Sequence, residues 1–98
     1  MIKFSEACEL AKSVMLKKGY EEGFLEIREA DDKWFFVGSF EKERPFGNLP
    51  IAVDRENGNC TVFKMFAPGN FTIYTSAKEL VIPKEYTCKA SYTGCFFM

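Results

Sequence analysis

The 98-residue chain contains no histidine. Histidine is the commonest general base, the usual partner of a nucleophilic serine or cysteine, and the commonest metal ligand. Its absence excludes a Ser-His-Asp or Cys-His catalytic site. The glycine-rich patterns GxxxxGK[ST] and GxGxxG, whose backbone amides cradle phosphates, are also missing. We therefore expect a protein that is not an enzyme and that holds no cofactor and no metal.

The chain also lacks long apolar runs. Residues 1–6 do not begin the apolar stretch of about 7 to 15 residues that a signal peptide needs. Nowhere do about 18 apolar residues follow one another, as a membrane-spanning helix requires. We expect a cytoplasmic protein with no membrane partner. Its four cysteines, Cys8, Cys60, Cys88 and Cys95, form no CxxC pair, so we expect reduced thiols that serve as small apolar residues.

Neither sign of charge dominates the sequence. Thirteen basic and fourteen acidic residues give a net charge of -1, and the basic residues are scattered among acidic ones. Proteins that bind the phosphate backbone concentrate Lys and Arg on one face. No nucleic-acid partner is expected.

What the chain does have is apolar and aromatic surface. Hydrophobic residues make up 47% of it and aromatic residues 16%, which is enough for one core. We therefore interpret residues 1–98 as a single domain. The first 19 residues predict an amphipathic helix, with Ser5 as the N-terminal cap and Gly19 in the left-handed closing position. The apolar face of that helix consists of Phe4, Ala7, Cys8, Ala11, Val14 and Met15.

Strand patterns follow the helix. The predicted strands are Phe24 to Ala30, Lys33 to Phe40, Leu49 to Asp54 and Cys60 to Phe66. Asp31-Asp32 forms the first turn, and Asn57-Gly58 suits a tight hairpin turn between the last two strands. The run Trp34 to Val37 indicates a central strand covered on both faces, or one covered by the helix on one face and by a partner on the other.

The pattern is less regular in the last third. Phe71 to Thr75 is strand-like, Ser76 to Leu80 could open a short helix capped by Ser76, and Tyr86 to Met98 favours an added strand. The predicted fold is α+β: an N-terminal helix packed on an antiparallel sheet of four to five strands, with a short C-terminal helix or an extra strand. The ending Cys95-Phe96-Phe97-Met98 fits a C-a-a-X prenylation box, for which chance is the better account.

One segment resembles a known family. The stretch Gly47-Asn48-Leu49-Pro50-Ile51-Ala52-Val53-Asp54-Arg55-Glu56-Asn57-Gly58 resembles the central motif of the bacterial immunity protein 35 family. The N-terminal helix and the aromatic strand are consistent with it over about residues 1 to 66. The resemblance implies a cytosolic protein, made beside a secreted polymorphic toxin, whose partner is that cognate protein toxin and which neutralises it by binding.

Two sets of residues follow from this resemblance. Pro50, Val53, Asp54 and Gly58 are interpreted as structural, because a strand start, a core position and a turn each give them a local reason to be there. The loop from Glu41 to Asn48 is longer than the usual hairpin connection, and long loops often carry function. Its residues Glu41, Glu43, Arg44 and Phe46 offer charges for steering and an aromatic anchor, so we expect them to contact the toxin.

Two other functions stay open. A small chaperone-like protein could hold unfolded chains with exposed aromatic residues such as those of Trp34 to Val37. An enzyme acting through carboxylates or a cysteine is the second alternative; Cys8 would lie in the first turn of the helix, where the dipole favours a thiolate. Its place on the apolar face favours core packing instead.

Overall fold

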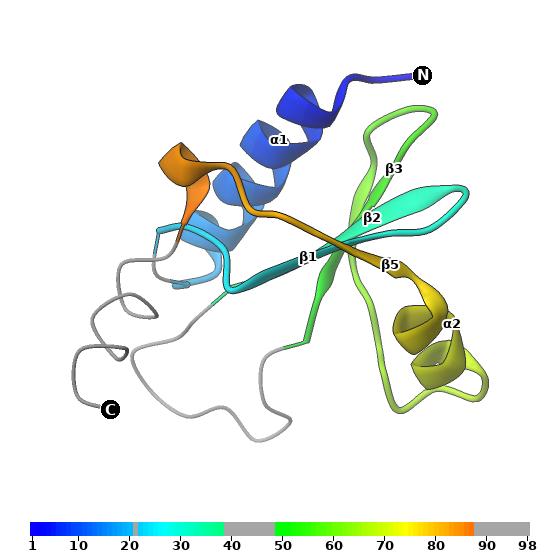
Figure 1. Ribbon diagram of the computed structural model, residues 1–98. Helices are drawn as coiled ribbons and strands as arrows, with labels where there is room; N and C mark the ends of the chain where they lie inside the picture. Colours follow the sequence, from blue (N-terminus) through cyan, green and yellow to red (C-terminus); the bar gives the residue numbers. More distant parts are fainter. Residues whose placement is uncertain (21, 39–48, 88–98) are drawn as a thin grey trace.

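The computed structural model describes residues 1–20, 22–38 and 49–87 (Figure 1). Its elements in chain order are α1 (Phe4–Lys17), β1 (Glu26–Glu29), β2 (Lys33–Val37), β3 (Ile51–Asp54), β4 (Cys60–Val62), α2 (Asn70–Ser76), β5 (Lys78–Leu80) and the 3-10 turn η1 (Lys84–Tyr86). An N-terminal helix and a five-stranded antiparallel sheet, joined by a second short helix, confirm the predicted α+β fold.

The five strands form one sheet in the order β4-β3-β2-β1-β5. The turn at Asp31-Asp32 joins β1 to β2 as predicted, and the Ala30 amide donates to the Lys33 carbonyl at 2.8 Å. β5 returns from the far end of the chain to pair with β1, with Ile27 opposite Leu80. This order places the aromatic strand β2 at the centre.

Both faces of β2 are covered by the chain itself. Because side chains alternate along a strand, Trp34 and Phe36 lie on the face that α1 covers, while Phe35 lies on the face that α2 covers. All three are almost completely buried. Figure 1 shows α1 and α2 on opposite sides of the sheet. Of the two arrangements predicted for this strand, the central one is therefore present.

Helix α1 packs through the predicted apolar face. Its residues Ala7, Cys8, Ala11 and Met15 are buried, and the helix lies against β2, β3 and β4. Gly19 closes the helix with a φ of 90°, as predicted. The predicted cap is wrong: the helix begins at Phe4, so Ser5 lies inside the first turn. The N-cap residue is Lys3, which makes no side-chain capping bond.

After residue 69, the sequence predicts a strand where the structure has a helix, and a helix where it has a strand. Phe71 to Thr75 does not form a strand but lies in α2, and Ser76 to Leu80 does not form a helix but contains β5. The β-branched and aromatic residues of α2 have strand propensity, yet burial of Tyr74 against Phe35 decides their conformation. The predicted strand from Cys60 to Phe66 is also shorter and ends at Val62.

The C-terminal predictions fall mainly outside the described residues. Residues 84–86 form a 3-10 turn and Thr87 forms an isolated parallel β-bridge with Phe24, while residues 88–98, with most of the added strand predicted from Tyr86 and the prenylation-like ending, lie outside the described part. No helix in the described ranges is long and apolar enough to span a membrane.

Candidate functional site

The residues of the Pro50 to Gly58 motif shape β3 and the turn that follows it. Pro50 precedes the strand and is buried, and Val53 is fully buried in the core beneath α1. The Asp54 carboxylate accepts the backbone amides of Glu56 at 2.8 Å and Asn57 at 3.3 Å. Gly58 has a φ of 79°, a left-handed conformation that favours glycine. Each motif residue thus has a local structural role in this hairpin.

Arg55 adds a contact that the sequence analysis missed. Its Nη1 donates to the Ala30 carbonyl at 2.9 Å and lies 3.4 Å from Oε1 of Glu29. Its guanidinium carbon is 5.0 Å from the centroid of the Trp34 ring. The Trp34 indole N–H donates to the same Glu29 oxygen at 3.3 Å. Arg55 therefore ties the β3–β4 turn to the β1–β2 hairpin.

The predicted contact residues Glu41, Glu43, Arg44 and Phe46 lie outside the described residues. The structure does place the residues on either side of that loop. Val37 precedes it, Pro50 follows it, and both line one pocket on the α2 side of the sheet. The described residues that directly flank the loop's undescribed range are Gly38 and Leu49, and the Tyr20 hydroxyl donates to the Leu49 carbonyl at 3.1 Å.

Glu26 is the main polar residue on the α2 side of the sheet. Its Oε1 accepts the Tyr74 hydroxyl and, at 3.0 Å, the Nε of Arg28. Arg28 also donates from Nη1 to the Ala77 carbonyl at 3.2 Å, and its guanidinium carbon lies 4.8 Å from the Tyr74 ring centroid. We call Glu26, Arg28 and Tyr74 the Glu26 cluster; it fastens α2 and the chain after it to β1.

The electrostatics of the Glu26 cluster favour an ionised carboxylate. Burial alone raises the pKa of Glu26, but the hydrogen bonds from Tyr74 and Arg28, with the charge of Arg28, outweigh it and lower the pKa from its ordinary value. Burial and the neighbouring carboxylate raise the pKa of Tyr74, so its hydroxyl keeps its proton. Strand alternation places Glu26 and Arg28 on one face, which the sequence could have shown. That Tyr74 joins Glu26 and Arg28 in this cluster depends on tertiary packing.

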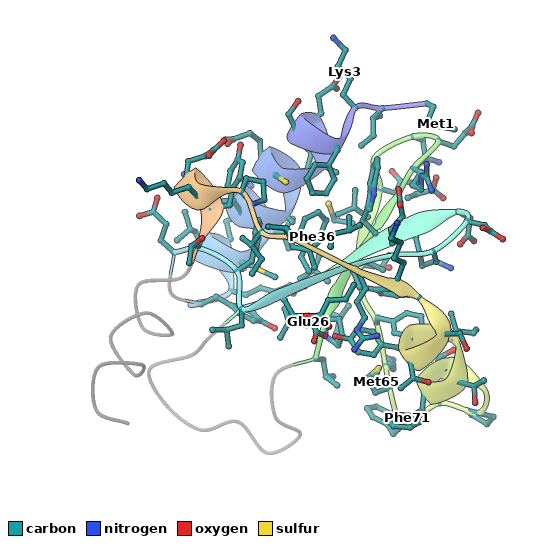
Figure 2. The ribbon with its side chains drawn as sticks, viewed as in Figure 1. Met1, Lys3, Glu26, Phe36, Met65 and Phe71 are labelled. Atoms are coloured by element: carbon teal, nitrogen blue, oxygen red, sulfur yellow. The ribbon has the colours of Figure 1, made fainter. Side chains whose placement is uncertain are left out.

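Two pockets meet at Glu26. The Met65 pocket has a volume of about 330 Å³ and is lined by Leu25, Glu26, Val37, Pro50, Met65 and Tyr74. The Ile82 pocket has a volume of about 450 Å³ and is lined by Glu26, Glu79, Leu80, Val81, Ile82 and Thr87. None of these lining residues is a lysine or arginine. Figure 2 shows Glu26 on the same side of the sheet as Met65 and Phe71.

An uncharged segment runs beside the Met65 pocket. Residues 65–77 contain no Asp, Glu, Lys or Arg, although 28% of the chain is charged and a stretch of this length would carry about four charges. It includes α2 and exposes large apolar side chains: Phe66 is 66% exposed, Phe71 64% and Ile73 45%. We refer to residues 65–77 as the uncharged segment.

Cys8 and the carboxylates offer little chemistry. Cys8 is completely buried, and burial, with the charges of Glu9 and Glu85, raises the pKa of its thiol to about 11. A thiol with that pKa is neutral near pH 7 and is a poor nucleophile. Across residues 1–20, 22–38 and 49–87, no three His, Cys, Asp or Glu side chains gather to hold a metal ion.

Comparisons with family models, with curated proteins and with solved structures found no match for this chain. What the protein does is therefore inferred from its own residues and their arrangement.

Proposed function

We propose that this protein is an immunity protein, which neutralises a cognate bacterial toxin by binding it directly in the cytoplasm, without catalysis. The observation that carries the proposal is the uncharged segment, which places Phe66 and Phe71 about two-thirds exposed on one part of the surface. The motif resemblance over residues 47–58 points to the same function.

The composition of the uncharged segment is that of an interface core. Such cores are depleted in charged residues and enriched in aromatic residues and methionine. Single exposed apolar residues are normal on any surface. Here, however, Met65, Phe66, Phe71 and Ile73 fall in the longest uncharged stretch of the chain, bounded by Lys64 and Lys78. A surface of this kind supports binding to another protein.

The fold holds this segment in place before any partner arrives. Tyr74 is buried against Phe35 and bonded to Glu26, and Asn70 donates from Nδ2 to the Lys64 carbonyl at 2.8 Å. Ordering a loop on binding costs conformational entropy, so a surface that is already fixed binds more tightly. Occlusion of the toxin by a preformed surface is the mechanism that these contacts support.

The loop residues Glu41, Glu43, Arg44 and Phe46 extend the proposed contact. Val37 and Pro50, which lie before and after the loop in the sequence, line the Met65 pocket. Its charges would steer the encounter with the toxin, and Phe46 would add an anchor.

Growth rescue tests the proposal. The toxin encoded beside this chain would be expressed in a bacterial host, alone and together with the chain. We expect the chain to restore growth, the double variant Phe66→Ser with Phe71→Ser to fail, and Leu16→Ser to succeed, since Leu16 is 47% exposed but lies on α1. Growth arrest despite a well-expressed parent chain would refute the proposal.

The aromatic residues of β2, which the chaperone alternative requires at the surface, lie in the core. Trp34, Phe35 and Phe36 are buried, so the expectation that they are exposed is wrong. The exposed aromatics that could hold unfolded chains are Phe66 and Phe71. A turbidity assay with several unrelated aggregating proteins separates the two functions, because an immunity protein should leave their aggregation unchanged.

A further inference from the structure

Among the described residues that line the Met65 pocket, Glu26 is the charged one, and its carboxylate has an open acceptor. The two hydrogen bonds that the Glu26 carboxylate accepts from Tyr74 and Arg28 both end on Oε1. Within the described part of the chain, Oε2 accepts no hydrogen bond. Because the bonds to Oε1 keep the carboxylate ionised, Oε2 retains free lone pairs in a residue that lines the Met65 pocket.

Arg28 forms an ion pair with Oε1 of Glu26 at 3.0 Å but does not line the Met65 pocket. Arg28 lies over the Tyr74 ring and donates to the Ala77 carbonyl. On the other side of Glu26, the Ile82 pocket adds a second carboxylate, that of Glu79. Among the described residues that line the two pockets, the charged ones are Glu26, which is paired with Arg28, and Glu79, and a positively charged group would complement them.

The other described residues that line the Met65 pocket carry mostly apolar side chains. Leu25, Val37, Pro50 and Met65 surround the space of about 330 Å³, with the ring of Tyr74. Lysine and arginine combine an aliphatic stem, which packs on apolar surface, with a charged end that needs a carboxylate. A pocket with apolar sides and a carboxylate has the chemistry to hold such a side chain.

The pocket is continuous with the proposed binding surface. Met65 and Tyr74 line it and also belong to the uncharged segment, whose Phe66 and Phe71 are exposed. A protein that covers the uncharged segment would therefore bring its own side chains to the mouth of the pocket. Removal of water from the contact would strengthen a charge pair formed there.

We propose that the Met65 pocket receives an arginine or lysine side chain of the protein partner, with its charge on Oε2 of Glu26 and its stem against Leu25, Val37 and Met65. This inference rests on the proposed function for the identity of the partner, and it adds the chemistry by which the partner is held. The partner's contact surface accordingly has a basic residue among apolar ones.

The experiment uses the full chain and four small probes: acetylated methylamides of arginine, lysine, citrulline and norleucine. Citrulline and norleucine keep the stem and lack the charge. Methyl resonances of Leu25, Val37 and Met65 would be followed by NMR during each titration. We expect saturable shifts with arginine or lysine, and binding at least about tenfold weaker with the matched neutral probe.

Two variants with the same change in net charge locate the effect. Glu26→Gln should weaken arginine and lysine binding by about tenfold, whereas Glu79→Gln, which alters the neighbouring pocket, should change it by less than about twofold. Met65→Lys should also abolish binding, because it brings an amine to the pocket without removing a member of the Glu26 cluster. That variant decides the question if Glu26→Gln does not fold.

Equal binding of charged and neutral probes, or undiminished binding by Glu26→Gln and Met65→Lys, would overturn the inference. The results distinguish failure of the pocket inference from failure of the proposed function. If the basic probes bind as expected but the toxin is not neutralised, the immunity function fails and the pocket inference holds. If the toxin is neutralised equally by the parent and by Glu26→Gln, the function holds and the pocket inference fails.

Discussion

Glycines with positive φ angles end or turn elements at several points in the chain. Gly58 (φ 79°) turns the β3–β4 hairpin, and Gly69 (φ 81°) precedes α2. A side chain on a left-handed residue crowds its own backbone, which costs about 1 to 2 kcal/mol. The two positions differ in their surroundings. A Cβ atom at Gly58 would lie 3.0 Å from Cδ1 of Leu10, whereas one at Gly69 would have nothing within 4 Å.

Gly58→Ala and Gly69→Ala form a matched pair for stability. We expect each to lower the free energy of unfolding by about 1 kcal/mol, since alanine strains the backbone at both positions. Gly58→Ala should cost more because Leu10 must move. Urea unfolding monitored by tryptophan fluorescence measures both values. If the Gly69→Ala protein were more stable than the parent, the left-handed backbone conformation at Gly69 would be contradicted.

Tyr86 predicts a loss of stability at high pH. Its hydroxyl donates to the Glu9 carboxylate on α1, and that hydrogen bond, with burial and the charge of Glu9, raises the pKa of Tyr86 to about 12 from an ordinary 10.0. The folded state then holds the proton more tightly than the unfolded chain does. This contribution to stability is complete below pH 10 and is lost as the pH rises from 10 to 12.

Tyr86→Phe should remove that part of the pH dependence. Urea unfolding of the parent and the variant between pH 8 and pH 12 measures it, and the difference in their free energies of unfolding should shrink above pH 10. Parallel curves over the whole range would show that the Glu9–Tyr86 bond does not contribute.

Cys8 and Cys60 should differ in reactivity. Cys8 is fully buried and Cys60 is partly exposed, although burial raises the pKa of both thiols. We expect N-ethylmaleimide at pH 8 to modify Cys60 at least about tenfold faster than Cys8 in the folded protein. Peptide mass mapping over a time course measures both rates. Rapid modification of Cys8 would instead favour the alternative in which this cysteine does chemistry.

At the scale of the elements, local patterns predicted the first part of the fold and failed in the last third. α1 and the two hairpins follow from the 3.6-residue period, strand alternation and turn residues, all of which act over short distances. α2 and β5 depend on contacts with β1 and β2, which are about 40 to 50 residues away in the chain. Such long-range packing overrides the propensity of a seven-residue segment.

Some residues of the candidate site could likewise be predicted from their neighbours in the sequence, and others depend on long-range packing. The roles of Asp54 and Gly58 in a turn could be predicted from their neighbours in the sequence. The Glu26 cluster could not, because Tyr74 is 48 residues from Glu26 and was expected to lie in a strand. The exposure of Phe66 and Phe71 was also missed, since composition alone does not show which of eleven phenylalanines remain outside the core.

Helix α2 and strand β2 provide a contrast between core and surface aromatics. Phe35 is fully buried beneath α2, whereas Phe71 on α2 is 64% exposed. We expect Phe35→Ala to lower the free energy of unfolding by about 3 to 5 kcal/mol. Phe71→Ala should change it by less than about 1 kcal/mol. Thermal and urea unfolding measure both, and a large loss for Phe71→Ala would mean that this residue supports the fold rather than a contact.

At the scale of the whole molecule, the two faces of the sheet are used differently. α1 covers one face, where the larger core cluster lies. The other face is covered by the short helix α2, where Phe71 is exposed, and the Glu26 carboxylate of β1 and the Met65 pocket lie on this face as well. Val37 and Pro50, which lie before and after the predicted contact loop in the sequence, line the Met65 pocket on that face. One side of the molecule therefore combines the features expected of a binding surface.

Calorimetric titration of the purified chain with the cognate toxin that the proposed function implies tests this account most directly. We predict a complex of one chain with one toxin, with a dissociation constant on the order of nanomolar, as an inhibitor acting by occlusion requires. The double variant Phe66→Ser with Phe71→Ser, measured in the same way, should bind at least about tenfold more weakly. Absence of binding by the parent chain, or equal affinity of the parent and the double variant, would contradict the account.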